Sequence, residues 1–321
     1  MTFSTLIVGL GQIGMGYDLS LDPDKYVLTH AKAFQKHPEF QLVGGVDPAQ
    51  SRRGLFETHF SVPSYSNIEC ALNVVKPDVV VISTPTALHA EAIRSVLKTA
   101  NPRAILCEKP LSYELDEAQE IVALCDSQKC QLFVNYMRRT EGGVAEVKRR
   151  LNEGSIGLPV RGVVWYSKGL FNNGSHFLNL LQYWLGEVTG FQVVNSGRLW
   201  GSIDPEPDLV LSFQHGKIFF LAAQEENYSH YTIELVAPNG RLRYEQSGER
   251  ILWQGTIKDA ACDGYTILDP VEEIIETNFM RLQWHVAEQL AAYLHGHQAD
   301  ICSGTEALQT LETLVAIRST L

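Results

Sequence analysis

The first 136 residues alternate between short apolar runs rich in β-branched residues and longer segments with helical spacing. The run at residues 79–82 is apolar throughout, which is typical of a strand that is covered on both faces. This alternation predicts a doubly wound parallel sheet, in which functional side chains gather at the carboxyl ends of the strands. The strand-like runs lie at residues 5–8, 40–46, 63–65, 79–82, 103–107 and 131–136.

The first run leads into a glycine-rich segment, Gly9-Leu10-Gly11-Gln12-Ile13-Gly14. A G-x-G-x-x-G pattern after a strand is typical of dinucleotide-binding loops, because glycines permit a tight turn and a close approach to a pyrophosphate. The second run leads into Asp47, whose carboxylate can accept hydrogen bonds from both ribose hydroxyls. These features predict NAD as the cofactor. Arg52 and Arg53 soften the preference, so NADP is the alternative.

Asp47 lies further from the glycines than the roughly 20 residues that usually separate the two features. Residues 15–27 contain Pro23 and several aspartates and show no helical period, so we interpret them as an insertion. The helix is then expected to begin near Thr29, a plausible N-cap. An insertion at this edge would lie over the cofactor or the substrate.

The pattern changes after about residue 158, where strand-like runs follow one another with short turns between them. His215-Gly216 and Pro238-Asn239-Gly240 fit hairpin connections, which predicts a mostly antiparallel sheet. Two helical segments, near 278–294 and 305–320, close the chain. The predicted strands lie at residues 160–167, 191–197, 209–214, 217–224, 231–237, 241–245 and 251–254.

The composition is that of an ordinary globular protein, with 45% apolar residues and a net charge of −11. The negative charge argues against nucleic acid and anionic membranes as partners. Neither a signal peptide nor a run of membrane-spanning length is predicted. The six cysteines form no CxxC pair, so we interpret them as reduced thiols of a cytoplasmic protein; no metal site is predicted.

Glu108-Lys109-Pro110 follows the fifth strand-like run. A lysine at the carboxyl end of a buried parallel strand can be desolvated, which lowers its pKa and suits it to proton transfer. Pro110 also restricts the backbone of Lys109 to extended geometry. A surface turn that carries a charged pair is the alternative for this tripeptide taken alone.

The glycine loop, Glu108-Lys109-Pro110 and a histidine early in the second half, His176, together resemble the Gfo/Idh/MocA oxidoreductases, which include glucose-fructose oxidoreductase and inositol dehydrogenase. Residues 83–91 are similar to the family's segment beside the nicotinamide. The resemblance covers nearly the whole chain. It implies an N-terminal Rossmann domain over residues 1–136 and an α+β substrate-binding domain over 137–321, with a mostly antiparallel open sheet and helices.

The resemblance also implies roles for site residues. Lys109 would contact the reacting hydroxyl and the nicotinamide ribose. Asn172 and His176 stand where the family carries Asp-x-x-x-His, and Asn179 stands where a further aspartate often follows. Because an amide cannot exchange protons near neutral pH, proton transfer would fall to Lys109 and His176. Residues 172–174 form a turn sequence, and Ser175 is a plausible N-cap of the helix that follows.

The predicted site residues fall into two sets. Candidates for cofactor binding are Gly9, Gly11, Gln12, Ile13, Gly14, Asp47, Ser83, Thr84, Pro85, His89, Glu108 and Lys109. Candidates for substrate binding are Lys109, Arg138, Asn172, His176 and Asn179. His89 and His176 could instead be packing histidines. Arg138 and Arg139 either hold an anionic group of the substrate or belong to a solvated face.

The leading hypothesis is an NAD(P)-dependent oxidoreductase that transfers a hydride between nicotinamide and a carbinol or carbonyl carbon. Its substrate would be a sugar, a cyclitol or a nucleotide-linked sugar. The alternatives are a non-catalytic dinucleotide-binding sensor or regulator, since fold does not decide function, and an enzyme with a non-sugar substrate. An exposed sheet face in the second domain would suit a homodimer or homotetramer.

Overall fold

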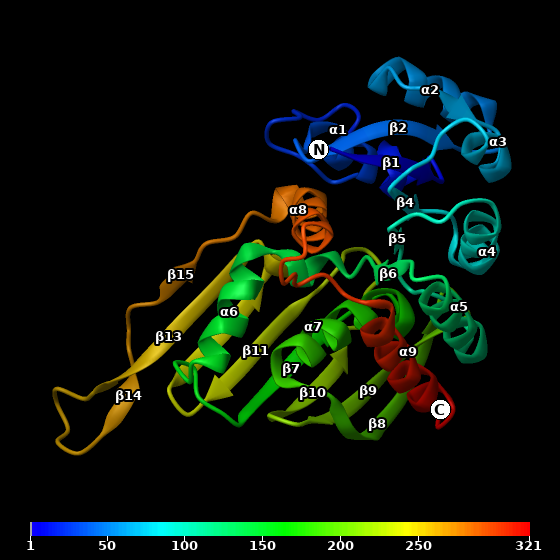
Figure 1. Cartoon of the computed structure of the whole chain (residues 1–321). Coiled ribbons are helices and arrows are strands. Elements are labelled where there is room, and N and C mark those ends of the chain that lie inside the picture. Colours follow the sequence, from blue (N-terminus) through cyan, green and yellow to red (C-terminus); the bar gives the residue numbers. More distant parts are fainter. Residues whose placement is uncertain (1) are drawn as a thin grey trace. The chain divides into compact units, whose positions relative to one another are not determined.

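The computed structural model describes residues 2–321 and divides into two compact units. Unit 1 comprises Met1–Thr140 and Met280–Leu311, and unit 2 comprises Glu141–Phe279 and Glu312–Leu321 (Figure 1). The sequence-based division assigned everything after residue 136 to the second domain. In the structure the chain instead returns to unit 1 at Met280.

The strands of unit 1 form the predicted parallel sheet, in the order β3-β2-β1-β4-β5-β6. The order reverses between β1 and β4, and ligands of such sheets bind beside this point, at the carboxyl ends of the strands. The strands are β1 (Phe3–Val8), β2 (Phe40–Val46), β3 (Ser64–Tyr65), β4 (Val79–Ile82), β5 (Ala104–Cys107) and β6 (Gln131–Val134).

Helices of unit 1 follow the strands as the alternation predicted. They are α1 (His30–Lys36), α2 (Gln50–Phe60), α3 (Ile68–Leu72), α4 (His89–Thr99) and α5 (Leu115–Ser127), with short turns η1 (Gln12–Gly16), η2 (Thr86–Leu88) and η3 (Met137–Thr140). A later helix, α8 (Leu282–Leu294), follows the short turn η6 (Phe279–Arg281). Val286 and Leu290 of α8 belong to the same buried cluster as Ile7 of β1 and Phe34 of α1. The apolar side of α8 is therefore part of the core of unit 1.

The segment interpreted as an insertion separates the glycine loop from α1. The loop enters only η1, a single π-helical turn, and α1 begins after Thr29, whose extended backbone confirms the predicted helix start. Asp18 anchors the segment: its carboxylate is fully buried and accepts hydrogen bonds from the backbone N–H groups of Leu28 and Thr29 and from the Thr29 hydroxyl. The far end pairs through Val27 with the backbone of Met280.

Unit 2 contains the predicted, mostly antiparallel sheet. Its order is β14-β13-β12-β11-β7-β10-β9-β8, with β15 beside β13; β7 and β10 run parallel, and both predicted hairpins, β9–β10 and β11–β12, are confirmed. The strands are β7 (Val160–Tyr166), β8 (Val188–Trp200), β9 (Asp204–Phe213), β10 (Gly216–Ala222), β11 (Thr232–Ala237), β12 (Gly240–Glu245), β13 (Arg250–Lys258), β14 (Thr266–Leu268) and β15 (Glu273–Ile275).

Helices α6 (Gly142–Asn152) and α7 (Ser175–Leu185) cover one face of this sheet (Figure 1). Helix α6 was not among the predicted helices. The turn η4 (Gly169–Gly174) leads into α7, and η5 (Gln246–Gly248) follows β12. The last helix, α9 (Gly304–Arg318), begins among residues of unit 1 and ends among residues of unit 2.

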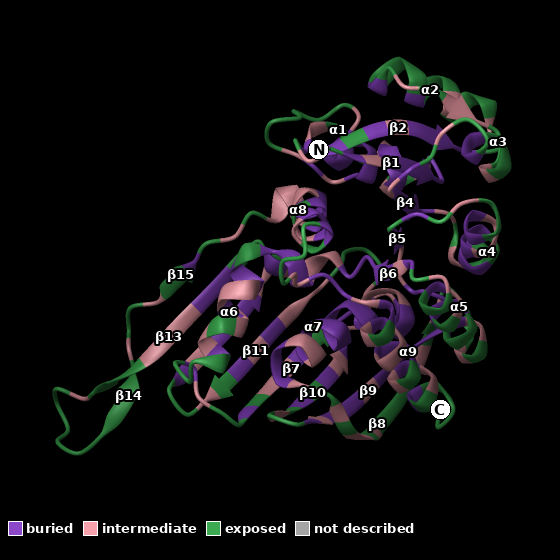
Figure 2. Cartoon of the chain, in the orientation of Figure 1, coloured by how far each residue is buried: buried purple, intermediate pink, exposed green. Residues whose placement is uncertain are grey.

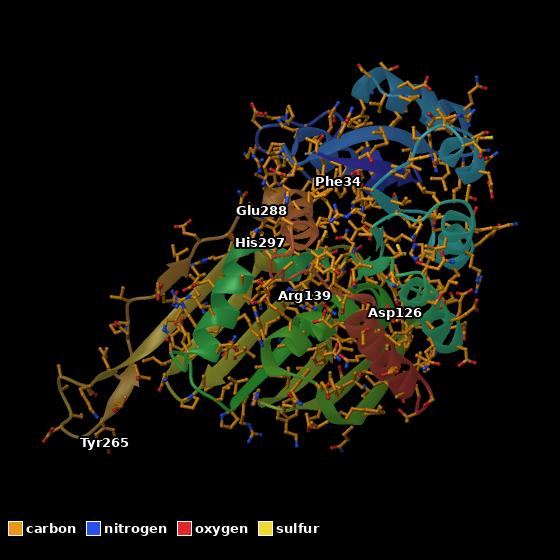
Figure 3. The ribbon with its side chains drawn as sticks, viewed as in Figure 1. Phe34, Asp126, Arg139, Tyr265, Glu288 and His297 are labelled. Atoms are coloured by element: carbon orange, nitrogen blue, oxygen red, sulfur yellow. The ribbon has the colours of Figure 1, made fainter. Side chains whose placement is uncertain are left out.

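The two faces of the sheet differ in exposure. In β7, Val164 and Tyr166 are fully buried, whereas the neighbouring Trp165 is 41% exposed. This period of two is that of a strand with only one covered face. The outer part of the β13–β14 hairpin is mostly exposed and has Tyr265 at its tip, whereas Ile251 and Leu252 at the start of β13 are buried (Figures 2 and 3). None of the helices described in residues 2–321 combines the length and apolar content that a membrane span requires.

Candidate cofactor and active site

A cavity of about 730 Å³ lies in unit 1 at the carboxyl ends of β1, β2 and β4. The structure brings together around it most of the residues predicted to bind the cofactor. Its lining includes Gly9, Gly11, Gln12, Ile13, Asp47, Ser83, Thr84 and Pro85. Tyr17, from the inserted segment, also lines it, whereas Gly14, His89, Glu108 and Lys109 do not.

Glycine occupies positions 9, 11 and 14 of the loop for a different structural reason at each position. Gly9 has a φ of +98°, and a Cβ there would lie 2.6 Å from the backbone of Ser83. A Cβ on Gly14 would lie 2.1 Å from the carbonyl oxygen of Gly9. Gly11 lines the cavity and has open space where a Cβ would project. A ligand can therefore approach the backbone at Gly11 closely, which is what the pyrophosphate of NAD requires.

Asp47 is nearly buried at the end of β2, with 2% of its surface exposed. Its Oδ2 accepts from the backbone N–H of Leu10 (3.0 Å), and its Oδ1 accepts from the backbone N–H of Ala49 (2.9 Å). Arg52 lines the cavity, 3.4 Å from Asp47 Oδ2, while Arg53 donates to the backbone oxygens of Asp47 and Pro48. Of the two arginines, only Arg52 therefore lines the cavity.

Glu108 and Lys109 follow β5 at the same edge of the sheet. Glu108 Oε1 accepts a hydrogen bond from Asn135 Nδ2 (2.6 Å) and lies 2.8 Å from His30 Nε2. Burial alone would raise the pKa of Glu108, but the hydrogen bond and charge of His30, the Asn135 amide and the Lys109 charge hold that pKa below its usual value. The Glu108 side chain is only 13% exposed, so this segment is not the solvated surface turn considered above.

His89 is buried between two loops of this edge. Its Nε2 lies 2.9 Å from the carbonyl oxygen of Thr84, and its Nδ1 lies 3.1 Å from that of Pro110. Burial lowers the pKa of His89, against the opposing effect of these hydrogen bonds. The ring thus ties the Ser83-Thr84-Pro85 loop to the segment that follows Lys109.

In unit 2, three predicted site residues lie on η4 and α7. His176 and Asn179 are buried on α7, and the Asn172 side chain donates to the carbonyl oxygen of Lys168 (3.1 Å). The prediction that Ser175 is an N-cap was wrong: η4 continues directly into α7, and the Ser175 hydroxyl donates to the carbonyl oxygen of Asn172. The turn sequence at 172–174 is accommodated inside a π-helical turn.

Two buried acids of β9, which the sequence analysis missed, hold this turn. Asp204 accepts from the backbone N–H groups of Phe171 (2.9 Å) and Asn172 (2.8 Å). Glu206 accepts from the backbone N–H of Lys168 at 2.6 Å. Burial raises the pKa of Asp204, and its backbone donors only partly oppose this effect. The period-two spacing of the two acids was the available signal, because it places both on one face of a strand.

Arg138 and Arg139 lie in η3. Arg139 is buried, pairs with Glu306 (2.7 Å) and donates to the carbonyl oxygen of Asp300 (3.1 Å). Its guanidinium is therefore engaged within unit 1. Arg138 is half-buried and remains the candidate of the two for an anionic group of the substrate.

Residues 3–136 match the model of an oxidoreductase family with an NAD-binding Rossmann fold, Gfo/Idh/MocA. This N-terminal domain belongs to the Gfo/Idh/MocA family. The match confirms the resemblance that the sequence motifs predicted, and with it the Rossmann fold of the first domain. It also supports NAD as the ligand of the cavity beside the glycine loop.

Curated relatives and solved structures extend the comparison to the whole chain. The inositol 2-dehydrogenase of Rhizobium meliloti is 28% identical over 99% of this chain and 97% of that enzyme. The D-xylose 1-dehydrogenase (NADP(+)) of Haloarcula marismortui is 36% identical, but the match covers 26% of this chain and only 22% of that enzyme. The WlbA dehydrogenase of Bordetella pertussis, solved with NADH and UDP-GlcNAcA, has a TM-score of 0.78 at 19% identity, over 99% of this chain and 95% of that chain. The fold of this chain is thus shared with WlbA.

Proposed function

We propose that the chain is an NAD(P)-dependent oxidoreductase that transfers a hydride between nicotinamide and the CH–OH carbon of a sugar, cyclitol or nucleotide-linked sugar. The observation that carries the proposal is that the glycine-loop cavity and Glu108-Lys109 lie at the same carboxyl edge of one parallel sheet. The substrate class is supported by the inositol, xylose and nucleotide-sugar dehydrogenases that the chain resembles.

The bound nicotinamide supplies the hydride chemistry, and the chain supplies binding, orientation and proton handling. The backbone at Gly11 receives the pyrophosphate, and Asp47 accepts hydrogen bonds from the adenosine ribose. Lys109 holds or removes the proton of the reacting hydroxyl at its Nζ. Asp47 favours NAD, while Arg52 gives NADP a cation for its 2′-phosphate.

In unit 2, we assign His176 to proton handling together with Lys109. Asn172 and Asn179 orient the substrate through their amides, because an amide donates and accepts hydrogen bonds but does not exchange protons near neutral pH. Arg138 is proposed to bind an anionic group of the substrate.

The second candidate function is a non-catalytic dinucleotide-binding sensor or regulator. Asn172 and Asn179 favour it, since both stand where the family usually carries carboxylates. The two candidates differ in one property, because only the enzyme needs the proton-handling group of Lys109.

The test begins with purification of the full chain and identification of any nucleotide that accompanies it. NAD(P)H-linked turnover is then measured over a panel of sugars, cyclitols and nucleotide sugars for the wild type and for Lys109→Met. Turnover that Lys109→Met abolishes supports the enzyme. Tight nucleotide binding without turnover on any substrate supports the regulator and contradicts the enzyme.

We further propose that the chain forms a homodimer or homotetramer through the uncovered face of the unit 2 sheet. Trp165, Phe219 and Val236 are 41%, 38% and 55% exposed there, beside a cavity of about 630 Å³. Trp165→Glu should shift the mass measured by light scattering toward the monomer, whereas Tyr265→Glu at the hairpin tip should not. A monomeric wild type would contradict this. A cytoplasmic location is also proposed, and the six scattered cysteines, which form no CxxC pair, support it.

A further inference from the structure

A cluster of largely buried polar side chains includes Glu108, the residue before Lys109, and each member comes from a different part of unit 1. His30 begins α1, Glu108 follows β5, Asn135 follows β6, and Gln283 lies on α8. His30, Asn135 and Gln283 are 0%, 2% and 1% exposed. Asn135 Nδ2 lies 2.6 Å from Glu108 Oε1 and 3.4 Å from Gln283 Oε1. The Glu108 carboxylate is therefore enclosed by polar groups that are far apart in the sequence.

Two donors converge on a single carboxylate oxygen. His30 Nε2 and Asn135 Nδ2 both lie within hydrogen-bond distance of Glu108 Oε1. Because an ionised carboxylate only accepts, the His30 proton belongs on Nε2. His30 Nδ1 is buried and has no hydrogen-bond partner within residues 2–321, so Glu108 is the group that orients the ring. Glu108 Oε2 faces the backbone N–H of Lys109 at 3.3 Å.

A buried carboxylate is costly unless it is paired and hydrogen-bonded, so this arrangement needs a reason beyond packing. The reason lies in the next residue. The Lys109 charge is among the influences that favour the ionised form of Glu108, and this attraction is mutual. An ionised, oriented Glu108 thus fixes the electrostatic surroundings of the proposed proton-handling lysine.

We propose that His30 is a positioning residue of this site: its Nε2–H keeps the Glu108 carboxylate ionised and in one orientation beside Lys109. The inference rests on the proposed function, because it gives Lys109 the role assigned to it there. His30 does not line the cofactor cavity, so its effect passes through Glu108.

The inference predicts a pH dependence. The titratable groups that face Glu108 are His30 from α1, His89 from α4, and Cys107 and Lys109 from its own segment. Loss of the His30 donor should let Glu108 take up a proton at higher pH. The acid limb of the kcat–pH profile should then move to higher pH.

The experiment compares His30→Met, which fills similar space without a donor, with His30→Gln, which retains one. His30→Met should lower kcat on the order of 10-fold to 100-fold while cofactor dissociation constants stay unchanged, because Lys109 is misplaced and the cavity is not. His30→Gln should recover most of the loss. His59→Met, on the exposed side of α2, is the matched control. Wild-type kcat and pH profile in a folded His30→Met would overturn the inference.

A second measurement needs no substrate. The ¹³C carboxyl signal of Glu108, assigned by its loss in Glu108→Gln, is titrated in the wild type and both His30 variants. The apparent pKa of Glu108 should rise by about one unit in His30→Met and return toward the wild-type value in His30→Gln. Identical titrations in all three proteins would overturn the inference even if the enzyme is active. Failure of the wild type to turn over any substrate would instead count against the proposed function.

Discussion

Glu108 of unit 1 and Asp204 of unit 2 are both buried carboxylates beside proposed site residues, but their surroundings shift their pKa values in opposite directions. Glu108 receives hydrogen bonds from the side chains of His30 and Asn135 and lies near the Lys109 charge, and its pKa is lowered. Burial raises the pKa of Asp204, with a smaller contribution from the charge of Glu206, and the hydrogen bonds from backbone N–H groups of η4 only partly oppose this rise.

The opposite pKa shifts of Glu108 and Asp204 correspond to two different structural roles of a buried carboxylate. In unit 1 a network of side chains controls the charge of one carboxylate next to Lys109, so a single substitution there can change chemistry. In unit 2 the acids Asp204 and Glu206 hold the backbone of a turn, so a substitution there changes mainly shape.

The largest effect is expected from Lys109→Met. If unit 1 controls chemistry, kcat should fall on the order of 10²–10⁴-fold, because a positioned acid or base is lost, while NADH binding is retained. Steady-state kinetics and fluorescence titration measure the two quantities, and Lys98→Met on the exposed side of α4 is the control. Near wild-type kcat in Lys109→Met, with turnover abolished by Asn172→Ala, would reverse the assignment of roles.

A smaller effect, on stability, is expected in unit 2. Asp204→Ala leaves the backbone N–H groups of Phe171 and Asn172 without their acceptor, which should lower the free energy of unfolding by about 1–3 kcal/mol. Because the turn carries Asn172, KM should rise more than kcat falls. Urea denaturation and steady-state kinetics measure both, with exposed Asp263→Ala as the control. Unchanged stability would remove Asp204 from its role in holding the turn.

The pH dependence of stability tests the comparison directly. The lowered pKa of Glu108 means that its ionised form stabilises the fold above its ordinary pKa of 4.5, and this contribution is lost as pH falls through the folded-state pKa. The raised pKa of Asp204 means that its ionised form is unfavourable, so stability falls as pH rises from 3.8 through the folded-state pKa.

The measured quantity is the free energy of unfolding of each variant minus that of the wild type, from about pH 6 to about pH 3. As pH falls, the free energy of unfolding of the wild type should exceed that of Glu108→Gln by less and less, because Glu108 becomes neutral like the glutamine. Over the same range the free energy of unfolding of the wild type should rise relative to that of Asp204→Asn, because Asp204 becomes neutral. Changes of the same sign in both pairs would show that the two carboxylates do not differ as described.

The smallest effect is expected at Asp47. Its carboxylate accepts hydrogen bonds from backbone N–H groups, as Asp204 does, and from a side chain, that of Arg52, as Glu108 does from other side chains. Arg52 is 55% exposed, so solvent screens its charge. Arg52→Ala should weaken NADPH binding relative to NADH by less than about fivefold. Arg53→Ala is the matched control, since its guanidinium donates to backbone oxygens instead. A stronger preference for NADPH in Arg52→Ala would contradict the role given to Arg52.

Local patterns were sufficient to predict most of the fold. The strand ending at Ile82, the helix start after Thr29 and the hairpin at residues 238–240 each follow from a few adjacent residues, and all three are present. Helix α6 was missed, and the turn η4 was interpreted as an ordinary loop before an N-cap. A π-helical turn that continues into an α-helix has no short sequence signature comparable to a cap.

The candidate site was predictable only where it follows a motif. Most of the glycine loop, together with Asp47 and residues 83–85, lines one cavity, whereas Gly14 does not. His30 could not be connected with Glu108, because the contact joins residues 78 positions apart and depends on where the insertion ends. The acids at 204 and 206 precede the predicted strand at 209–214 and are separated by a proline, a residue that disfavours central strands, so the local pattern does not indicate the longer strand β9.

The return of α8 to unit 1 has a consequence for synthesis on the ribosome. Val286, Leu290 and Leu294 belong to the same buried cluster as Ile7, Phe34 and other residues from the first third of the chain. A nascent chain that ends before residue 280 therefore exposes the apolar surface that α8 will cover. Domains made first usually fold first, but this one completes its core only after α8 has been translated. A fragment that ends at residue 136 should therefore be prone to aggregate.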